Sequence, residues 1–389
     1  KDFQTDICGE TEWLMRNIVK RIISLTAALG IIGSITAGTL PSFADGSAEQ
    51  PSGGPVTAIS RGELPSYSEY KELNGGVNAA ESSVSLTGGS YSSENGSGAE
   101  RLESYEGKSS VLKWESEKGS VTYEFTIPET GLYNIALTYM QLLCHGNDIR
   151  IALKIDGAYP FDDAGDIALP RLWTDKGGVR TDNNGDQISP EQTELFEYTS
   201  QVLRDNEGVA VLPYEFALSA GKHSITLEMK AEAFALAEVT LCPPEKTEDY
   251  KTVSEGYSEK DYYSGAPVVI EGEDAAIKTS NSLIPKSDNS AFLTPASPKN
   301  LMINYIGSGN WSSPGQVLTW KFTVPKTGIY ELGFKYKQSQ LVNGVSYRYL
   351  KIDGKTPFSE ARAIAFPYDT GWQISEYSDN GTPYLLQLD

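Results

Sequence analysis

Residues 123–133 read YEFTIPETGLY, and residues 320–330 read WKFTVPKTGIY. The correspondence continues at the same offset of 197 residues, because both 153–157 and 350–354 read LKIDG. The alignment of the two copies shifts only locally, near Gly146 and Gly344. Agreement over this length predicts an internal duplication.

Each copy alternates apolar and polar residues after its Pro-x-Thr-Gly turn. The apolar positions are 133, 135, 137 and 139 in the first copy and 330, 332, 334 and 336 in the second. A period of two is typical of strands with one buried face, and the Asp-Gly pairs at 156–157 and 353–354 predict tight hairpins. We therefore expect an all-β protein with two tandem β-sandwiches.

A secretory signal peptide is predicted over residues 15–44. It has a basic start at 15–21, an apolar run from Ile22 to Leu40, and a small-x-small cleavage site at Ser42-Phe43-Ala44. Residues 1–14 precede Met15 and are interpreted as upstream sequence outside the natural protein. The chain is therefore expected to be exported and extracellular or associated with the cell surface. An uncleaved membrane anchor is the alternative.

The remaining boundaries follow from composition and from the repeat. Residues 45–66 are rich in Ser, Gly and Pro and predict a flexible linker. The first sandwich is predicted at 67–245, a second linker at 246–265, and the second sandwich at 266–389. The second copy stops after Leu388 without a counterpart of the 221–241 hairpin, so we expect an incomplete sandwich whose natural chain continues.

The repeated pattern Gly-[Leu/Ile]-Tyr, Tyr-x-Gln and Ile-Asp-Gly-x-x-Pro-Phe resembles a known group of domains. It is similar to the galactose-binding-like modules at the N-terminus of large solute-binding proteins of bacterial ABC importers. The resemblance covers about residues 66–389 and implies jelly-roll sandwiches, carbohydrate or another small solute as ligand, and importer membrane components as partners. The solute-capturing domain of that family lies C-terminal to such modules, so a transport role is implied only indirectly.

Candidate ligand-binding residues are aromatic rings and amides in loops, because sugars offer apolar faces and many hydroxyls. They are Trp173, Gln141, Trp311, Gln338, Tyr368 and Trp372. The alternative is that the rings cap the core and that the glutamines satisfy loop backbone. Trp114 and Trp320 lie in alternating runs and are expected in the core.

A structural calcium site is the candidate metal site. Glu271 and Glu273 begin the second copy, and in related carbohydrate-binding modules a glutamate at this place helps to hold calcium. Carboxylate oxygens suit this cation. A solvated acidic strand edge is the alternative.

Composition and motifs argue against several classes of partner, metal site and catalytic activity. The net charge of −20 argues against nucleic acid and anionic membranes as partners. Cys8, Cys144 and Cys242 show no zinc spacing, and a Cys144–Cys242 disulfide or two free thiols remain open. His145 and His223 are the two histidines, and no GxSxG, HExxH or phosphate loop occurs. We therefore expect that this protein is not an enzyme.

Three functions fit these observations. The first is a non-catalytic binding region of an importer's solute-binding protein. The second is a structural spacer or adhesion pair that holds a downstream domain away from the wall. The third is an accessory region of a secreted glycosidase.

Overall fold

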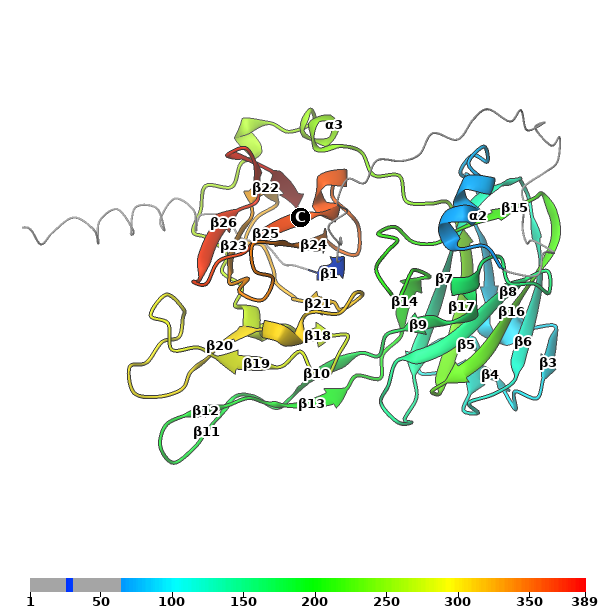
Figure 1. The fold of residues 1–389 in the computed structure, drawn as a ribbon, viewed down its shortest axis with the longest axis horizontal. Helices are drawn as coiled ribbons and strands as arrows, with labels where there is room; N and C mark the ends of the chain where they lie inside the picture. Colours follow the sequence, from blue (N-terminus) through cyan, green and yellow to red (C-terminus); the bar gives the residue numbers. More distant parts are fainter. Residues whose placement is uncertain (1–25, 31–63) are drawn as a thin grey trace, which may run out of the picture. The chain divides into compact units, whose positions relative to one another are not determined.

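The computed structural model describes residues 26–30 and 64–389 and divides the chain into two compact units (Figure 1). Residues 64–171 and 196–245 form one unit, here called the N-terminal sandwich. Residues 26–30, 172–195 and 246–389 belong to the other, here called the C-terminal unit. The predicted upstream stretch, most of the predicted signal peptide and nearly all of the first linker lie outside the described residues.

Two antiparallel sheets build the N-terminal sandwich. One runs β14-β7-β17-β5-β4, with β15 also on β7 and β2 also on β17, and the other runs β3-β6-β16-β8-β9. The strands are β2 (Val84–Thr87), β3 (Ser93–Asn95), β4 (Glu100–Tyr105), β5 (Lys108–Trp114), β6 (Ser120–Ile127), β7 (Gly131–Gln141), β8 (Ile149–Ile155), β9 (Ile167–Leu169), β14 (Thr199–Val202), β15 (Glu215–Leu218), β16 (Gly221–Ala231) and β17 (Phe234–Cys242). The all-β sandwich prediction is confirmed.

The repeated alternation fills the core between these sheets. In β6, Val121, Tyr123, Phe125 and Ile127 are buried while their neighbours face outward. Trp114 is fully buried, as expected, and its ring centroid lies 5.9 Å from that of Phe234. Burying one face of each sheet provides the main stabilisation of such a fold.

The Asp-Gly hairpins have the conformation that the sequence predicts. Asp156 and Gly157 have φ of 51° and 82°, and Asp353 and Gly354 have φ of 49° and 77°. Two successive positive φ angles are characteristic of a type I′ turn. The duplication is therefore preserved at the level of backbone geometry.

The C-terminal unit consists of short strands in small sheets. They are β1 (Thr26–Gly30), β18 (Ile277–Lys278), β19 (Pro285–Ser287), β20 (Ile303–Ile306), β21 (Leu318–Thr319), β22 (Gly328–Glu331), β23 (Gly333–Tyr336), β24 (Val345–Lys351), β25 (Ile364–Pro367), β26 (Gln373–Glu376), β27 (Ser378–Asp379), β28 (Thr382–Pro383) and β29 (Leu385–Leu388). Strand β1, inside the predicted signal peptide, pairs antiparallel with β24, which also pairs with β25.

A short helix opens each copy. Tyr67 of α2 (Tyr67–Leu73) accepts a hydrogen bond from the Glu215 N–H at 2.9 Å, and Tyr250 of α3 (Tyr250–Ser254) accepts one from Leu385 N–H at 3.0 Å. Both tyrosines pack into the core of their own unit. The sequence suggested residues 246–265 as a linker, but α3 within them is thus the first structural element of the second copy.

Residues 172–195 form a two-part hairpin, here called the arm. It contains β10 (Trp173–Lys176), β11 (Arg180–Thr181), β12 (Gln187–Ile188) and β13 (Glu191–Glu194), and β10 pairs with both β13 and β18. In β12 of the arm, the Gln187 N–H donates a hydrogen bond to Leu301 O at 2.8 Å. The arm therefore belongs to the C-terminal unit, although the sequence suggested a continuous first domain from 67 to 245.

Cys144 and Cys242 are free thiols, so the disulfide alternative is not realised. His223 bridges Asp156 Oδ2 at 2.7 Å and Ser219 O at 2.8 Å, which is a structural role. Within the part of the chain that the structure describes, no helix has the length and apolar character needed to cross a membrane.

Candidate functional site

Two loops of the C-terminal unit meet where β23 and β26 pair. Tyr336 lies opposite Gln373, so residues 337–344 and 368–372 leave the same end of this sheet. The Asp369 N–H donates to Gln338 O at 2.8 Å, and the Tyr368 N–H donates to Gly344 O at 2.9 Å. The pairing therefore brings three of the predicted residues, Gln338, Tyr368 and Trp372, into one loop cluster.

Trp372 is the centre of the best-formed polar and aromatic site in this cluster. Its indole N–H donates to Asp288 Oδ2 at 3.2 Å, and its ring lies edge-on to Tyr305 with a centroid distance of 5.6 Å. Lys337 Nζ lies 3.6 Å from the same Asp288 oxygen. Both rings are half-buried, so part of each remains accessible. We call these four residues the Trp372 site.

Asp288 is held as a carboxylate in this position. Burial raises its pKa, but hydrogen bonds from the Ser290 N–H and the Trp372 indole, together with Lys337, outweigh that effect. The pKa of Asp288 therefore lies below its ordinary value. A fixed carboxylate beside two partly exposed rings can accept ligand hydroxyl hydrogen bonds while the rings cover an apolar ligand face.

Gln338 serves its own loop. Its Oε1 accepts from the N–H groups of Gln340 at 3.0 Å and Leu341 at 2.9 Å, and its Nε2 donates to Leu341 O and Gly344 O, both at 3.3 Å. This matches the structural alternative that the sequence left open for the amide. Gln338 thus shapes the loop that carries Lys337.

Trp311 occupies a different setting in the same unit. Arg348 Cζ lies 4.4 Å from the centre of its ring, and the indole N–H donates to Gln316 O at 3.3 Å. The ring packs against a small core of Leu283, Leu318 and Trp320, in which Trp320 is buried as expected. A cation–π contact occupies one face of Trp311, so at most the other face could stack on a ligand.

Trp173 and Gln141 are placed apart from the Trp372 site. Trp173 is half-buried on β10, opposite Glu194 of β13 and Lys278 of β18. Gln141 ends β7 in the N-terminal sandwich and is fully buried opposite Phe234. A fully buried amide offers a ligand no surface, so Gln141 is an interior residue of the sandwich.

Glu271 and Glu273 have features of a cation site. Glu273 is buried, and its Oε2 has no hydrogen-bond partner among the described residues. Burial, reinforced by Glu271 and Asp274, raises the pKa of Glu273 to about 7, and burial also raises the pKa of Glu271. An unsatisfied carboxylate oxygen beside further carboxylates fits a hard cation such as calcium.

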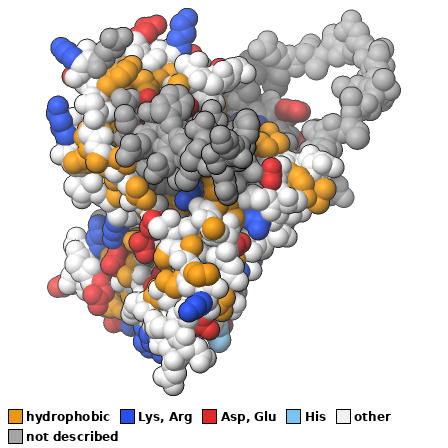
Figure 2. Space-filling model, turned by 90° about the vertical axis from the view of Figure 1, so that its left-hand side faces the viewer, with side chains coloured by type: hydrophobic (Ala, Val, Ile, Leu, Met, Phe, Trp, Pro, Cys, Tyr) orange, Lys and Arg blue, Asp and Glu red, His pale blue; other side chains and the backbone are white. Residues whose placement is uncertain are grey.

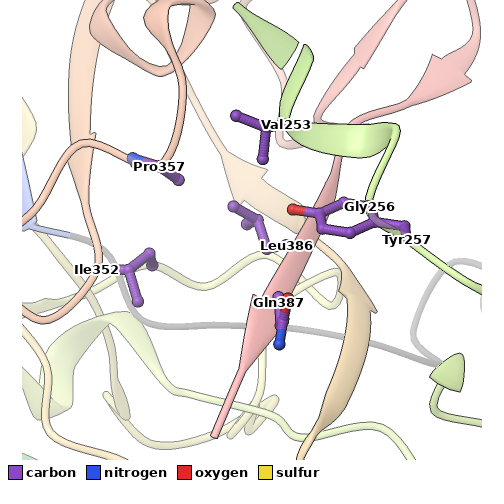
Figure 3. Close-up of a pocket in the computed structure, with 7 residues that line it drawn as sticks. All are labelled: Val253, Gly256, Tyr257, Ile352, Pro357, Leu386 and Gln387. Carbon is purple, nitrogen blue, oxygen red and sulfur yellow. The ribbon is translucent and has the colours of Figure 1, made fainter. Parts of the chain in front are cut away.

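The C-terminal unit also contains a hollow (Figure 3). Its volume is about 280 Å³, and it is lined by Val253, Gly256, Tyr257, Ile352, Pro357, Leu386 and Gln387. None of the predicted ligand-binding residues lines it. Ligand pockets combine an apolar lining with a few precisely placed polar groups, and Tyr257 and Gln387 are the polar side chains in this lining.

The sequence did not single out Tyr305, Asp288 or Lys337. Asp288 follows β19, Tyr305 lies on β20, and Lys337 follows β23. The Asp-Asn-Ser sequence at 288–290 indicates a turn, and the Ser290 N–H does donate to Asp288 Oδ1 at 2.8 Å. Nothing in that signal shows that the other carboxylate oxygen reaches Trp372.

The exposed surface is mixed in character. On the face shown in Figure 2, hydrophobic side chains lie in small groups among charged and other polar ones. Single apolar side chains scattered over a protein surface are normal.

No family model matches the sequence, and no curated protein matches it. Several solved structures are similar to part of the chain. A C-terminal family 6 carbohydrate-binding module of a laminarinase from Zobellia galactanivorans has a TM-score of 0.28 and 12% identity over 41% of this chain and 99% of that one. A family 35 module from Clostridium thermocellum has a TM-score of 0.25 and 9% identity over 41% and 98%.

Larger proteins are also among the similar structures. A family 26 mannanase of Podospora anserina with a family 35 module has a TM-score of 0.27 and 10% identity, and the match covers 47% of this chain and 33% of that one. The match therefore spans only a third of the mannanase. Because all these TM-scores are low, the fold assignment rests on the sheets described above.

Proposed function

We propose that this chain is a non-catalytic carbohydrate-binding region, and that the Trp372 site carries the binding. The supporting observation is the Trp372 indole held by Asp288 at 3.2 Å and set edge-on to Tyr305. A pyranose ring would stack on the accessible part of an aromatic face. Its hydroxyls would then meet the Asp288 carboxylate and the Lys337 ammonium.

The arrangement is pre-formed, which favours binding. Trp372 is oriented by its indole hydrogen bond, and Asp288 is oriented by the Ser290 N–H. A ligand therefore pays little for ordering these side chains.

A glycan array followed by fluorescence titration tests this proposal. We expect binding to be lost or weakened at least tenfold in Trp372→Ala and weakened in Asp288→Asn. Phe196→Ala is the matched control, because Phe196 is an aromatic residue of the other unit with 46% exposure. Absence of binding to every glycan would refute the proposal and favour the spacer function.

The sequence resemblance supports a more specific role for this region in an importer. We propose that the region belongs to the extracellular solute-binding protein of an ABC importer. Reading the coding sequence downstream of residue 389 tests it. A solute-binding domain there supports the importer setting, whereas a glycosidase domain supports the accessory-region alternative.

We also propose that residues 15–44 act as a signal peptide that directs export and is then cleaved. Sequencing the N-terminus of the secreted protein should give Asp45 as the first residue. Retention of residues 15–44 in a membrane fraction would instead indicate an uncleaved anchor.

A further inference from the structure

Three loops of the N-terminal sandwich bring four metal-ligating side chains together at one end of its sheets. Glu117 lies in the β5–β6 loop, Cys144 and His145 follow β7, and Glu232 lies in the β16–β17 turn. One potential ligand atom from each lies within 4.8 Å of the other three. This cluster is separate from the Trp372 site, which belongs to the other unit.

Three of these atoms form a nearly regular triangle. Cys144 Sγ lies 3.2 Å from His145 Nδ1 and 3.7 Å from Glu117 Oε1, and His145 Nδ1 lies 3.4 Å from that oxygen. A tetrahedral zinc ion with ordinary bond lengths places sulfur, nitrogen and oxygen ligands roughly 3.3–3.6 Å from one another. The observed spacing therefore needs shifts of only a few tenths of an ångström to hold one ion.

Glu232 holds the loop rather than completing the triangle. Its side chain is buried, and it accepts the N–H groups of His145 at 3.0 Å, Gly146 at 3.3 Å and Asn147 at 3.2 Å. Arg171 pairs with it at 3.1 Å. Its Oε1, 3.8 Å from His145 Nδ1, already accepts two hydrogen bonds from Asn147. Glu232 is therefore a positioning residue.

We infer that Cys144, His145 and Glu117 form a binding site for a zinc-class divalent cation, with a fourth position open to water or an external ligand. Thiolate, imidazole and carboxylate are all common zinc ligands, and three protein ligands leave one coordination position free. The thiolate and the carboxylate together balance the charge of the ion. Calcium is disfavoured because sulfur and nitrogen replace the oxygen ligands that it requires.

The site is accessible to an ion from solvent. The side chains of His145 and Glu117 are 68% and 43% exposed, whereas Glu232 beneath them is 1% exposed. The ligands therefore lie on a surface rim supported by a buried positioning residue. Such support is typical of metal sites, in which an outer carboxylate fixes the geometry of the ligands.

Calorimetric titration of the full chain with Zn²⁺ tests this inference. We expect one ion per chain, release of the Cys144 thiol proton on binding, and loss of binding in Cys144→Ser and in His145→Ala. Glu232→Gln should bind about 10–100-fold more weakly. Cys242→Ser and Cys8→Ser are controls and should bind as the parent chain does.

Co²⁺ provides an independent readout that does not depend on stability. The parent chain should show a thiolate-to-cobalt charge-transfer band that Cys144→Ser lacks and Cys242→Ser keeps. Glu232→Gln should keep the band at a higher Co²⁺ concentration, which separates positioning from ligation. If Cys144→Ser does not fold, the exposed His145→Ala variant decides the question. Unchanged Zn²⁺ binding in His145→Ala, or no thiolate band in the parent chain, would overturn the inference.

Discussion

Gly88, in the short 3-10 turn Gly88–Ser90, lies directly against the backbone of β17. A Cβ atom there would lie 1.7 Å from Leu236 O and 3.0 Å from Leu112 N. These are backbone atoms of two strands in one sheet, so they cannot move aside locally. The absence of a side chain at Gly88 thus sets how closely this turn approaches the sheet.

We therefore expect Gly88→Ala to destabilise the N-terminal sandwich by about 3 kcal/mol or more, in the upper range of overpacking. Gly76→Ala is the matched control, because Gly76 is exposed and a Cβ there meets nothing within 4 Å. Its effect should stay within about 0.5 kcal/mol. Urea unfolding measures both, and equal effects would contradict the role of close approach.

Glu273 predicts a pH dependence for the metal-free protein. Its folded pKa of about 7 lies above its ordinary value of 4.5, so the folded state retains a proton that the unfolded state has lost. The resulting stability is fully present below pH 4.5 and is lost as pH rises to about 7, by up to about 3 kcal/mol. Unfolding in EDTA at both pH values measures it.

Glu273→Gln is the control for this pH effect, and it should reduce the loss of stability between pH 4.5 and about 7. Calcium should also restore stability at pH 7, because it favours the charged carboxylate and binds the folded state. A calcium effect that persists in Glu273→Gln would place the ion elsewhere.

At the scale of elements, the arm depends on a buried charge. Lys278 of β18 is fully buried, and its Nζ lies 2.5 Å from Asp175 Oδ1 of β10 and 3.2 Å from Gln192 Oε1. Burial lowers the pKa of Lys278, and Asp175 opposes that shift. The ion pair therefore links β10 to β18.

We expect Asp175→Ala to cost about 3–5 kcal/mol, because it leaves a buried ammonium without its partner. Lys278→Met should cost much less, because it removes the charge while keeping an apolar stem of similar length. Thermal unfolding of the two variants distinguishes these effects. A larger loss in Lys278→Met would show that the pair itself is strongly stabilising.

At the scale of the whole molecule, the chain passes between two compact units at 171–172, 195–196 and 245–246. Each unit has its own core, built around Trp114 and Phe234 in one and around Tyr330 and Phe358 in the other. Two separate cores favour two unfolding transitions rather than one.

Calorimetry should therefore resolve two transitions, with hydrogen exchange assigning each to its segments. Gly88→Ala should lower only the transition of the N-terminal sandwich. Asp175→Ala should lower only the transition of the C-terminal unit, although Asp175 lies between strands of the first copy in sequence. One cooperative transition shifted by both variants would show that the units do not unfold independently.

Much of the fold was determined by local sequence pattern. The alternation in 121–127 specifies a half-buried strand, and Asp156-Gly157 specifies a hairpin turn, because neighbouring residues alone decide which conformations are allowed. The same reasoning identified Trp372 as a loop aromatic. The prediction of Glu271 and Glu273 as calcium ligands came instead from the resemblance to carbohydrate-binding modules.

Only the tertiary structure decided which distant residues meet. Tyr305 of β20 and Asp288 of the loop after β19 reach Trp372 from 67 and 84 residues earlier in the chain, and no local pattern encodes such a contact. The arm pairs with β18 and places Asp175 beside the buried Lys278, 103 residues later in the chain, and no local pattern encodes that contact either. Local sequence sets the conformation of each segment, whereas packing and charge pairing between segments select their partners.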